Sequence, residues 1–245
     1  MKKVLISYGN PKYYKSLDLL EKTALEVGKV DLFIRYTREW LETTEFYKKN
    51  KYILDMPRGN GYWIWKPFII LESFKALNDD DIVMYSDAGL SVIDSLIPLF
   101  EMAQMNPNDG IMLFEVPGGH KLRTWTKRDA YILTDTDSPK YYDHTIINGA
   151  LSLWVKNEKT ISFLNEWQRY LRDPRIVTDD PNMCGNANIA GFKEHRHDQS
   201  VLSLLAIKKE FEFFRDPTQF GEEDRKRFPE CTYKQLFNHH RGVGI

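Results

Sequence analysis

Short apolar runs alternate with stretches of helical spacing along the first half of this chain, and this alternation limits the possible folds most. The runs predict strands at 4–7, 31–36 and 81–85, and apolar residues that recur every three or four positions predict helices at 12–27, 39–50 and 67–77. Strands that alternate with helices fold most simply into a parallel sheet with helices on both faces. We therefore expect an α/β fold, with residues 1–245 in a single domain and a mostly parallel central sheet flanked by helices.

The remaining segments are less regular. Further strands are expected at 111–114, 151–155 and 212–214, and further helices at 95–105, 126–133, 159–171 and 199–208. Residues 52–56 are expected to be a strand or extended chain, 173–191 a long polar loop, and 221–245 a charged irregular tail. In such sheets ligands bind beyond the carboxyl ends of the strands. Polar residues at those ends are therefore the first candidates for a functional site.

The composition argues against several classes of protein. The chain is 42% hydrophobic and its formal net charge is −1, so it lacks the basic excess that broad nucleic-acid binding requires. Cys184 and Cys231 lack metal-binding spacing, so we expect two free thiols in a reducing compartment. No apolar run is long enough for a signal peptide or a transmembrane segment. We expect a cytoplasmic chain that starts at Met1.

Asp87 is the first candidate site residue. It follows the apolar run 81–85, and Ala88 and Gly89 leave the backbone beside it accessible to a bulky ligand. One carboxylate at a strand end can hold Mg²⁺ or Mn²⁺ when substrate phosphates supply further oxygens. A plain strand-end turn explains the same residues, so this stretch alone leaves both interpretations open.

A second polar cluster occupies residues 194–200, at the predicted start of a helix. Asp198 alone fits a helix N-cap, an interaction of about 1 kcal/mol. Capping does not explain Arg196, His197 and Gln199 beside it. Free N–H groups and the positive end of the helix dipole suit an anionic or hydroxyl-rich ligand, so these four residues are candidates for binding and catalysis.

An aromatic cluster at 61–67 contains Trp63, Trp65 and Lys66. In an extended chain both tryptophans point to the same side, where they form a stacking surface with Lys66 directed at a phosphate. The same residues also fit a hydrophobic staple for the helix expected at 67–77.

Three further groups carry weaker signals. Asn148 and Gly149 precede a predicted strand and fit either a turn or a surface that faces a sugar. His239 and His240 can complete a metal shell, although such a pair near a chain end is more often without function. A basic patch at 123–128 fits either phosphate binding or a solvated helix face.

Several catalytic signatures are absent from the sequence: the G-x-S-x-G elbow, the P-loop, the G-x-G-x-x-G loop and H-E-x-x-H. Their absence argues against serine hydrolases, P-loop NTPases, dinucleotide oxidoreductases and zincins.

Taken in order, the polar elements resemble those of a nucleotide-sugar glycosyltransferase of the GT-A fold, a Rossmann-like domain. "SYGNPKYY" includes the first strand end, and "VMYSDAG" ends a later strand. "INGALSLW" is similar to the Asn-Ser-Gly element of family-8 glycosyltransferases and their relatives, and "EHRHDQSVLSLL" is similar to their Asp-Gln element. "GYWIWKP" and "EHRHDQSVLSLL" also look like parts of capsule or surface-glycan transferases. The resemblance covers about residues 3–207.

The resemblance implies roles for the matching residues. Asp87 is similar to the metal-binding Asp of an Asp-x-Asp motif, with His239 or His240 as a late metal ligand, whereas Gly89 stands in place of the second Asp. Together with the clusters above, this assigns donor binding to Tyr8, Asn10, Tyr13, Lys66, Asn148, Gly149, Arg196 and His197, stacking or acceptor contacts to Trp63 and Trp65, and catalysis to Asp198 and Gln199.

The implied reaction moves a sugar from a nucleoside-diphosphate sugar, with UDP as the expected nucleotide, to a glycan or lipid-linked hydroxyl acceptor. Charge develops on the leaving diphosphate, where a divalent cation (Mn²⁺ or Mg²⁺) with Lys66 or Arg196 would stabilise it. The anomeric centre becomes oxocarbenium-like, as in glycoside hydrolysis. Asp198 is the carboxylate expected beside it, as a base with inversion or as a stabiliser with retention. Peripheral membrane contact would bring a lipid-linked acceptor within reach.

Three alternatives stay open. A glycoside hydrolase needs two carboxylates across one bond, which Asp87 and Asp198 can supply. A non-catalytic module that binds sugar nucleotides or glycans is consistent with the missing second Asp. A nucleotidyltransferase also uses a metal and an α/β sheet, but "YGNPKYY" lacks the usual glycine-rich basic loop.

Overall fold

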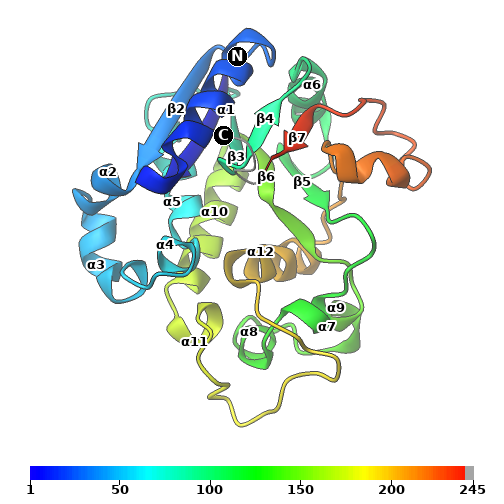
Figure 1. The fold of residues 1–245 in the computed structure, drawn as a ribbon. Helices are drawn as coiled ribbons and strands as arrows, with labels where there is room; N and C mark the ends of the chain where they lie inside the picture. Colours follow the sequence, from blue (N-terminus) through cyan, green and yellow to red (C-terminus); the bar gives the residue numbers. More distant parts are fainter. Residues whose placement is uncertain (241–245) are drawn as a thin grey trace.

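The computed structural model describes residues 1–240 and contains a central five-stranded sheet in the order β2-β1-β3-β6-β5 (Figure 1). The strands are β1 (Lys3–Gly9), β2 (Leu32–Thr37), β3 (Ile82–Ser86), β5 (Ile111–Glu115) and β6 (Ile147–Val155). β1 is parallel to β2 and to β3, whereas β6 is antiparallel to both of its neighbours, β3 and β5. Four of the five strands therefore run in one direction, which confirms the mostly parallel α/β sheet.

The alternation of side chains along the strands divides the core into two layers. In β1, Val4 and Ile6 belong to one cluster of buried side chains, and Leu5 between them belongs to the other. Successive side chains of a strand point to opposite faces of its sheet. Both faces of this sheet are therefore apolar, and both need a covering layer.

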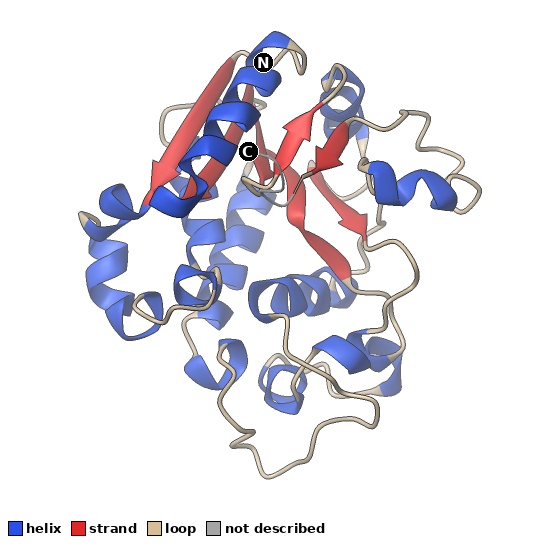
Figure 2. Ribbon diagram, in the orientation of Figure 1, coloured by secondary structure: helices blue, strands red, loops and turns tan. Residues whose placement is uncertain are grey.

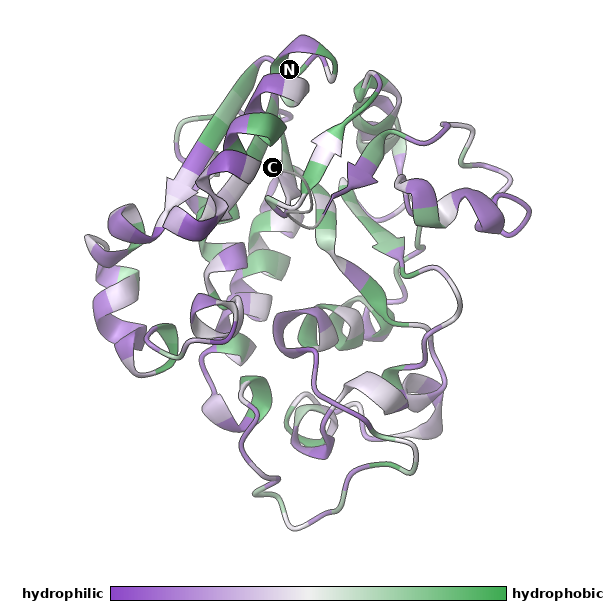
Figure 3. Ribbon diagram, viewed as in Figure 1, coloured by the Kyte–Doolittle hydropathy of each residue, from purple (hydrophilic) through white to green (hydrophobic). Residues whose placement is uncertain are grey.

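Helices provide both covering layers. α1 (Tyr14–Glu26) and α6 (Ile97–Met105) pack against the face that carries Leu5. α5 (Trp65–Phe74), α10 (Glu158–Leu171) and α12 (His197–Lys208) pack against the other face. Figure 2 shows the strands between helices, and Figure 3 shows hydrophobic residues in the strands and mixed hydropathy along α1.

Shorter elements surround this core. They are α2 (Arg38–Glu42), α3 (Glu45–Leu54), α4 (Gly59–Tyr62), α7 (Leu122–Trp125), α8 (Arg128–Leu133), α9 (Pro139–Tyr142), α11 (Pro174–Val177), and the 3-10 helices η1 (Pro11–Tyr13) and η2 (Gln219–Asp224). β4 (Leu90–Val92) and β7 (Phe237–His239) form a separate antiparallel ribbon. The helices α7, α8, α9 and α11 gather at the end of the molecule opposite the N-terminus (Figure 1).

The aromatic segment differs from its predicted conformation. Residues 61–67 are not extended: Trp63 has a φ of 59°, in the left-handed region, and α5 begins at Trp65. The two tryptophans therefore do not share one side of a strand. Gly59 and Gly61 also have positive φ values, so the segment before α5 is a tight turn.

The secondary structure predicted for three other short segments is also wrong. Residues 52–54 lie in α3, because Ile53 and Leu54 continue the buried face of this helix. Phe214 forms one isolated bridge with Phe114 in place of a strand. The tail predicted to be irregular contains part of η2 and all of β7 up to residue 240, and its last residues, 241–245, lie outside the described part.

Within residues 1–240, the longest helix is α10, with 14 residues. None of the helices in this range has the length and apolar character needed to cross a bilayer.

Candidate functional site

A cavity of about 710 Å³, here called the first cavity, lies at the carboxyl ends of β1 and β3. The starts of α5, β6 and α12 also reach it. Because β6 is antiparallel to β3, its first residues meet the end of β3. The predicted site residues that line this cavity are Tyr8, Asn10, Tyr13, Trp63, Trp65, Lys66, Asp87, Asn148, Gly149, Arg196, His197, Asp198, Gln199 and His239. His240 is outside the described lining.

Lys66 is buried at the wall of the first cavity. Its Nζ lies 2.9 Å from Asp198 Oδ2 and 3.7 Å from Asp87 Oδ1, and it donates a hydrogen bond of 2.8 Å to the carbonyl of Gly149. The ammonium group therefore joins three segments that are distant in the sequence. Its donors point at protein oxygens, so its predicted contact with a phosphate stays a prediction.

Burial controls the protonation of this centre. Burial acts to lower the pKa of Lys66, but Asp198 and Asp87 outweigh it and hold the pKa above its ordinary value. Burial raises the pKa of Asp198 to about 6, while Lys66 opposes the rise and Asp87 adds to it. At neutral pH the pair therefore consists of an ammonium group and a carboxylate.

Tyr85 completes the surroundings of Asp87. Its hydroxyl donates a short hydrogen bond to Asp87 Oδ1. Burial, together with the charge of Asp87, raises the pKa of this hydroxyl well above its ordinary value, so it remains a donor. Tyr85 was not among the predicted residues, although a residue two positions before Asp87 in a strand points to the same side.

Asp198 does not cap α12. Arg196 occupies the N-cap position without a side-chain capping bond, and Asp198 lies in the first turn with its carboxylate toward Lys66. Its Oδ2 lies 2.9 Å from Lys66 Nζ, and the ammonium group is its partner in the fold. The carboxylate therefore lines the first cavity as the partner of Lys66.

The start of β6 is held tightly against α12. Gln199 Nε2 donates a hydrogen bond of 2.7 Å to the carbonyl of Ile147. A Cβ at Gly149 would lie 3.1 Å from Gln199 Cβ, so the glycine permits this close approach. The backbone N–H of Asp87 donates to the carbonyl of Ala150 at 2.8 Å, which fixes the end of β3 against the same segment.

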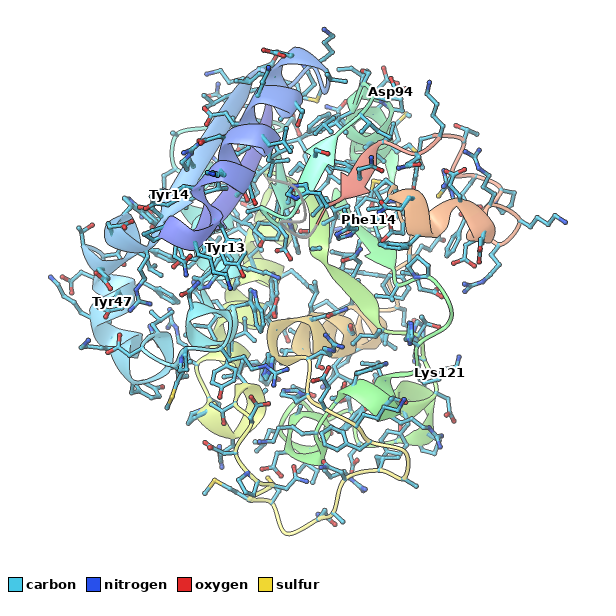
Figure 4. The ribbon with its side chains drawn as sticks, in the orientation of Figure 1. Tyr13, Tyr14, Tyr47, Asp94, Phe114 and Lys121 are labelled. Atoms are coloured by element: carbon cyan, nitrogen blue, oxygen red, sulfur yellow. The ribbon has the colours of Figure 1, made fainter. Side chains whose placement is uncertain are left out.

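The turn after β1 forms the opposite wall. The rings of Tyr8 and Trp65 stack, with centroids 4.0 Å apart. Asn10 Oδ1 accepts a hydrogen bond from the N–H of Lys12 and caps η1. Tyr13 is exposed at the N-terminal end of α1, where Figure 4 labels it, and is available to a flat ligand group. Trp65 is already occupied by Tyr8, so Tyr13 is the freer stacking surface.

His197 supports Trp63. The two rings stack with centroids 5.6 Å apart, and His197 Nδ1 lies 2.8 Å from the carbonyl of Val177. Burial lowers the pKa of His197 to about 4, so the ring is neutral at pH 7. It therefore fixes an aromatic wall of the cavity without adding a charge.

Two arginines bring positive charge to the rim. Arg58, which was not predicted, forms ion pairs of 3.2 Å with Asp179 and with Glu194. Arg196 pairs with Glu194 at 2.7 Å, and its guanidinium lies 4.6 Å from the centre of the Trp125 ring. A basic residue in the Pro-Arg-Gly-Asn turn before the aromatic cluster was the available signal for Arg58.

The donors near Asp87 fit a divalent cation only with help from a substrate. Within residues 1–240, no three His, Cys, Asp or Glu side chains form a metal-binding group. The side chain of Asp87 is 39% exposed and lines the cavity together with His239, which pairs with Leu90 in the β4-β7 ribbon. Mg²⁺ and Mn²⁺ accept one or two protein oxygens when phosphates complete the shell. Asp87 and His239 are therefore the residues that would hold a cation shared with a diphosphate.

Comparison by sequence finds no matching protein-family model and no matching curated protein. Comparison by structure finds glycosyltransferases. Mouse xyloside xylosyltransferase 1 superposes with a TM-score of 0.52 at 12% identity, over 98% of this chain and 97% of that one. The bifunctional glycosyltransferase WbbM superposes with a TM-score of 0.55 at 9% identity, over 98% of this chain and 46% of that one.

GlyE from Streptococcus pneumoniae TIGR4 gives a TM-score of 0.45 at 14% identity, over 98% of this chain and 54% of that one. This chain thus spans about half the length of GlyE and of WbbM. The sheet, its two helix layers and the likeness to the xylosyltransferase and WbbM agree with the fold expected from the sequence. The chain has the GT-A-like fold found in glycosyltransferases.

Proposed function

We propose that this chain is a glycosyltransferase that moves a sugar from a nucleoside-diphosphate sugar, with a UDP-sugar as the first candidate, to a hydroxyl acceptor. The observation that carries the proposal is Lys66, whose buried ammonium group lies between Asp198 and Asp87 at the wall of the first cavity. We propose that the acceptor is a glycan or a lipid-linked molecule. We also propose that the reaction takes place in the cytoplasm, at a membrane surface where polysaccharides are assembled.

The charge of the first cavity favours an anionic donor. Its described lining carries four cationic side chains and two carboxylates, which are Lys12, Arg58, Lys66, Arg196, Asp87 and Asp198. Lys66 is used inside the protein, and Arg58 and Arg196 both pair with Glu194. Lys12 is therefore the cation that remains to attract a diphosphate, and the two arginines would have to exchange Glu194 for it. Tyr13 and Trp63 offer aromatic surfaces on which a base or a sugar can stack.

Asp198 supplies the carboxylate that the reaction needs. It is ionised at pH 7 because its pKa is about 6, and Lys66 holds it in one orientation. An ionised carboxylate beside the anomeric carbon either accepts the proton of the acceptor hydroxyl or stabilises the oxocarbenium-like centre. Gln199 contributes by fixing the start of β6. A divalent cation at Asp87, when bound, would supply neutralisation of the leaving diphosphate.

The arrangement is less suited to glycoside hydrolysis. A hydrolase places its two carboxyl groups on opposite sides of the scissile bond. Here Asp87 and Asp198 both approach the same ammonium group. They share a cation, so both carboxylates are engaged inside the protein, where a hydrolase would direct them at the substrate.

A thermal-shift assay tests the proposal. The protein is heated with UDP, GDP, CMP or dTDP, each with Mn²⁺, Mg²⁺ or EDTA. A nucleotide at about a hundredfold excess over its dissociation constant stabilises the folded state by about 2.7 kcal/mol, or several degrees for a chain of this size. We expect one nucleotide to give this shift and Asp87→Asn to reduce it by more than half.

Asp79→Asn is the matched control, because Asp79 precedes the same strand at its other end and its side chain is 85% exposed. It should keep the full shift. If the thermal shift persists in EDTA, the proposal of a transferase is kept, and the proposal that a divalent cation takes part in nucleotide binding is dropped. No shift with any nucleotide rejects the proposal and leaves a glycan-binding module or a hydrolase.

A further inference from the structure

A second cavity of about 600 Å³ adjoins the first. The two cavities have four lining residues in common: Asn148, Arg196, Gln199 and His239. The rest of the second cavity comes from the loop after β5, from η2 and from their neighbours. Its size is within the range of sites for small ligands. A ligand there would meet one in the first cavity at a shared wall.

The second cavity has a different charge from the first. Among the described residues its lining carries one arginine, Arg196, and two carboxylates, Asp216 and Glu223. Arg196 is already paired with Glu194. This lining has no cationic excess with which to hold a phosphate or a carboxylate.

The two carboxylates of the second cavity differ in their hydrogen bonding. Asp216 is buried, and accepts a hydrogen bond of 2.6 Å from Asn148 Nδ2 and one of 2.8 Å from the N–H of Thr218. Asp216 therefore orients the amide of a residue that faces both cavities. Glu223 makes no side-chain hydrogen bond or ion pair with residues 1–240, so its oxygens can accept hydrogen bonds from hydroxyl groups of a ligand.

Phe220 provides an aromatic surface in this lining. Its side chain is 47% exposed, and its ring lies 5.5 Å from that of His239, measured between centroids. The other large aromatic ring, Trp125, already contacts Arg196 and the edge of His120. A half-exposed aromatic ring beside a free carboxylate is a combination that suits a sugar, which has an apolar ring face and polar hydroxyls.

We propose that the second cavity binds the acceptor, and that the group bound there is an uncharged sugar ring packed on Phe220 with its hydroxyls directed at Glu223. This inference rests on the proposed function and names the acceptor class for it. A phosphate-bearing or acidic acceptor would have to leave its charged group outside this cavity.

The shared wall contains direct sequence neighbours of the residues that meet at Lys66. Gln199 follows Asp198 directly, and the oriented Asn148 precedes Gly149, whose carbonyl accepts from Lys66. In the transfer, the bond from the anomeric carbon to the diphosphate oxygen breaks, and a bond to the acceptor oxygen forms. The acceptor proton leaves to Asp198 with inversion, or to the departing diphosphate with retention.

Saturation-transfer difference NMR tests this assignment. The probes are neutral methyl glycosides of glucose, galactose and xylose, with methyl glucuronide and glucose 6-phosphate as charged counterparts. Each is mixed with protein that is saturated with the nucleotide giving the largest thermal shift. We expect at least one neutral glycoside to give a signal at least fivefold above its charged counterparts. Phe220→Ala should reduce that signal at least fivefold, and Glu223→Gln should reduce it about twofold.

Tyr52→Ala is the matched control, because Tyr52 is an exposed aromatic residue outside both cavities. It should leave the glycoside signal unchanged, and Phe220→Ala should keep the nucleotide shift. The assignment is overturned if Phe220→Ala keeps the glycoside signal, if the charged probes give the stronger one, or if no neutral glycoside gives any.

The two proposals fail separately. If no nucleotide shifts the melting temperature of the wild-type protein, the proposal that the chain is a glycosyltransferase is rejected. If the neutral glycosides still depend on Phe220 in that protein, the second cavity is a sugar site on a binding module. A nucleotide shift with no dependence on Phe220 retains the transferase and rejects this acceptor site.

Discussion

The two cavities share a wall and differ in charge. The described lining of the first has more cations than carboxylates, and that of the second has one arginine against two carboxylates. Two residues of the shared wall are fixed by hydrogen bonds: Asn148 donates to Asp216, and Gln199 donates to the carbonyl of Ile147. The difference teaches how one surface could hold two ligands in contact: under our proposals, charge sorts an anionic donor from a neutral acceptor, and the shared wall lies between them.

The largest effect is expected from Lys66→Met. This change leaves Asp198 and Asp87 facing the first cavity without the ammonium group between them. Breaking a buried ion pair by removing one partner costs about 3–5 kcal/mol. We expect the free energy of unfolding, measured by urea denaturation, to fall by that amount and transferase activity to fall below detection.

Two further variants show whether the loss of stability and activity in Lys66→Met comes from the buried ion pair. Lys12→Met removes an exposed lysine from the same cavity and should change the free energy of unfolding by no more than about 0.5 kcal/mol. Lys66→Met combined with Asp198→Asn should recover part of the stability but no activity. Wild-type stability in Lys66→Met would mean that the first cavity is not organised around this pair.

The second prediction distinguishes the role of Asp198, in the first cavity, from that of Asp216, in the second. The proposed transfer requires ionised Asp198, whose pKa is raised to about 6 by burial. Protonation below that value removes the reactive carboxylate, so kcat/KM should be constant above about pH 7 and fall about tenfold per unit below pH 6. Asp198→Asn should abolish this acidic limb and lower kcat/KM by about 10²–10⁴.

Asp216→Asn provides the comparison, since Asp216 lines the second cavity and acts through Asn148. It should keep the acidic limb and raise the KM for the acceptor. An acidic limb that is unchanged in Asp198→Asn and lost in Asp216→Asn would reverse the roles of the two carboxylates.

The sequence was sufficient for the first cavity because strand ends and helix starts have local signatures. Asp87 after an apolar run and the polar cluster at 196–199 were recognisable as such, and the rule that ligands bind at carboxyl ends of strands brought them together. The antiparallel β6 was not recognisable, because a buried strand has the same composition in either direction.

The centre of the site and the second cavity depend on tertiary contacts. Trp63 is left-handed just before α5, where Lys66 is buried, and no periodicity signals that turn. Asp216 lies 68 positions from Asn148 in the sequence and meets it only in the fold. Apart from the wall that it shares with the first, the second cavity is lined by residues whose sequence is typical of loops or of the irregular tail, so its existence could not be predicted.

The smallest expected effect concerns salt. Raising the ionic strength from about 50 to about 500 mM shortens the screening length of exposed charges severalfold. Lys12 and Arg58 are at least partly exposed in the first cavity, so the dissociation constant of the nucleotide should rise about three- to tenfold. The constant for a neutral glycoside in the second cavity should change less than about twofold, because no net charge on that ligand is screened. Titration calorimetry for the nucleotide and NMR for the glycoside measure both.

Lys12→Gln sharpens this test, since it removes one exposed cation and should make nucleotide binding less sensitive to salt. Equal salt dependence for both ligands would contradict the electrostatic difference between the cavities and would leave shape alone to sort donor from acceptor.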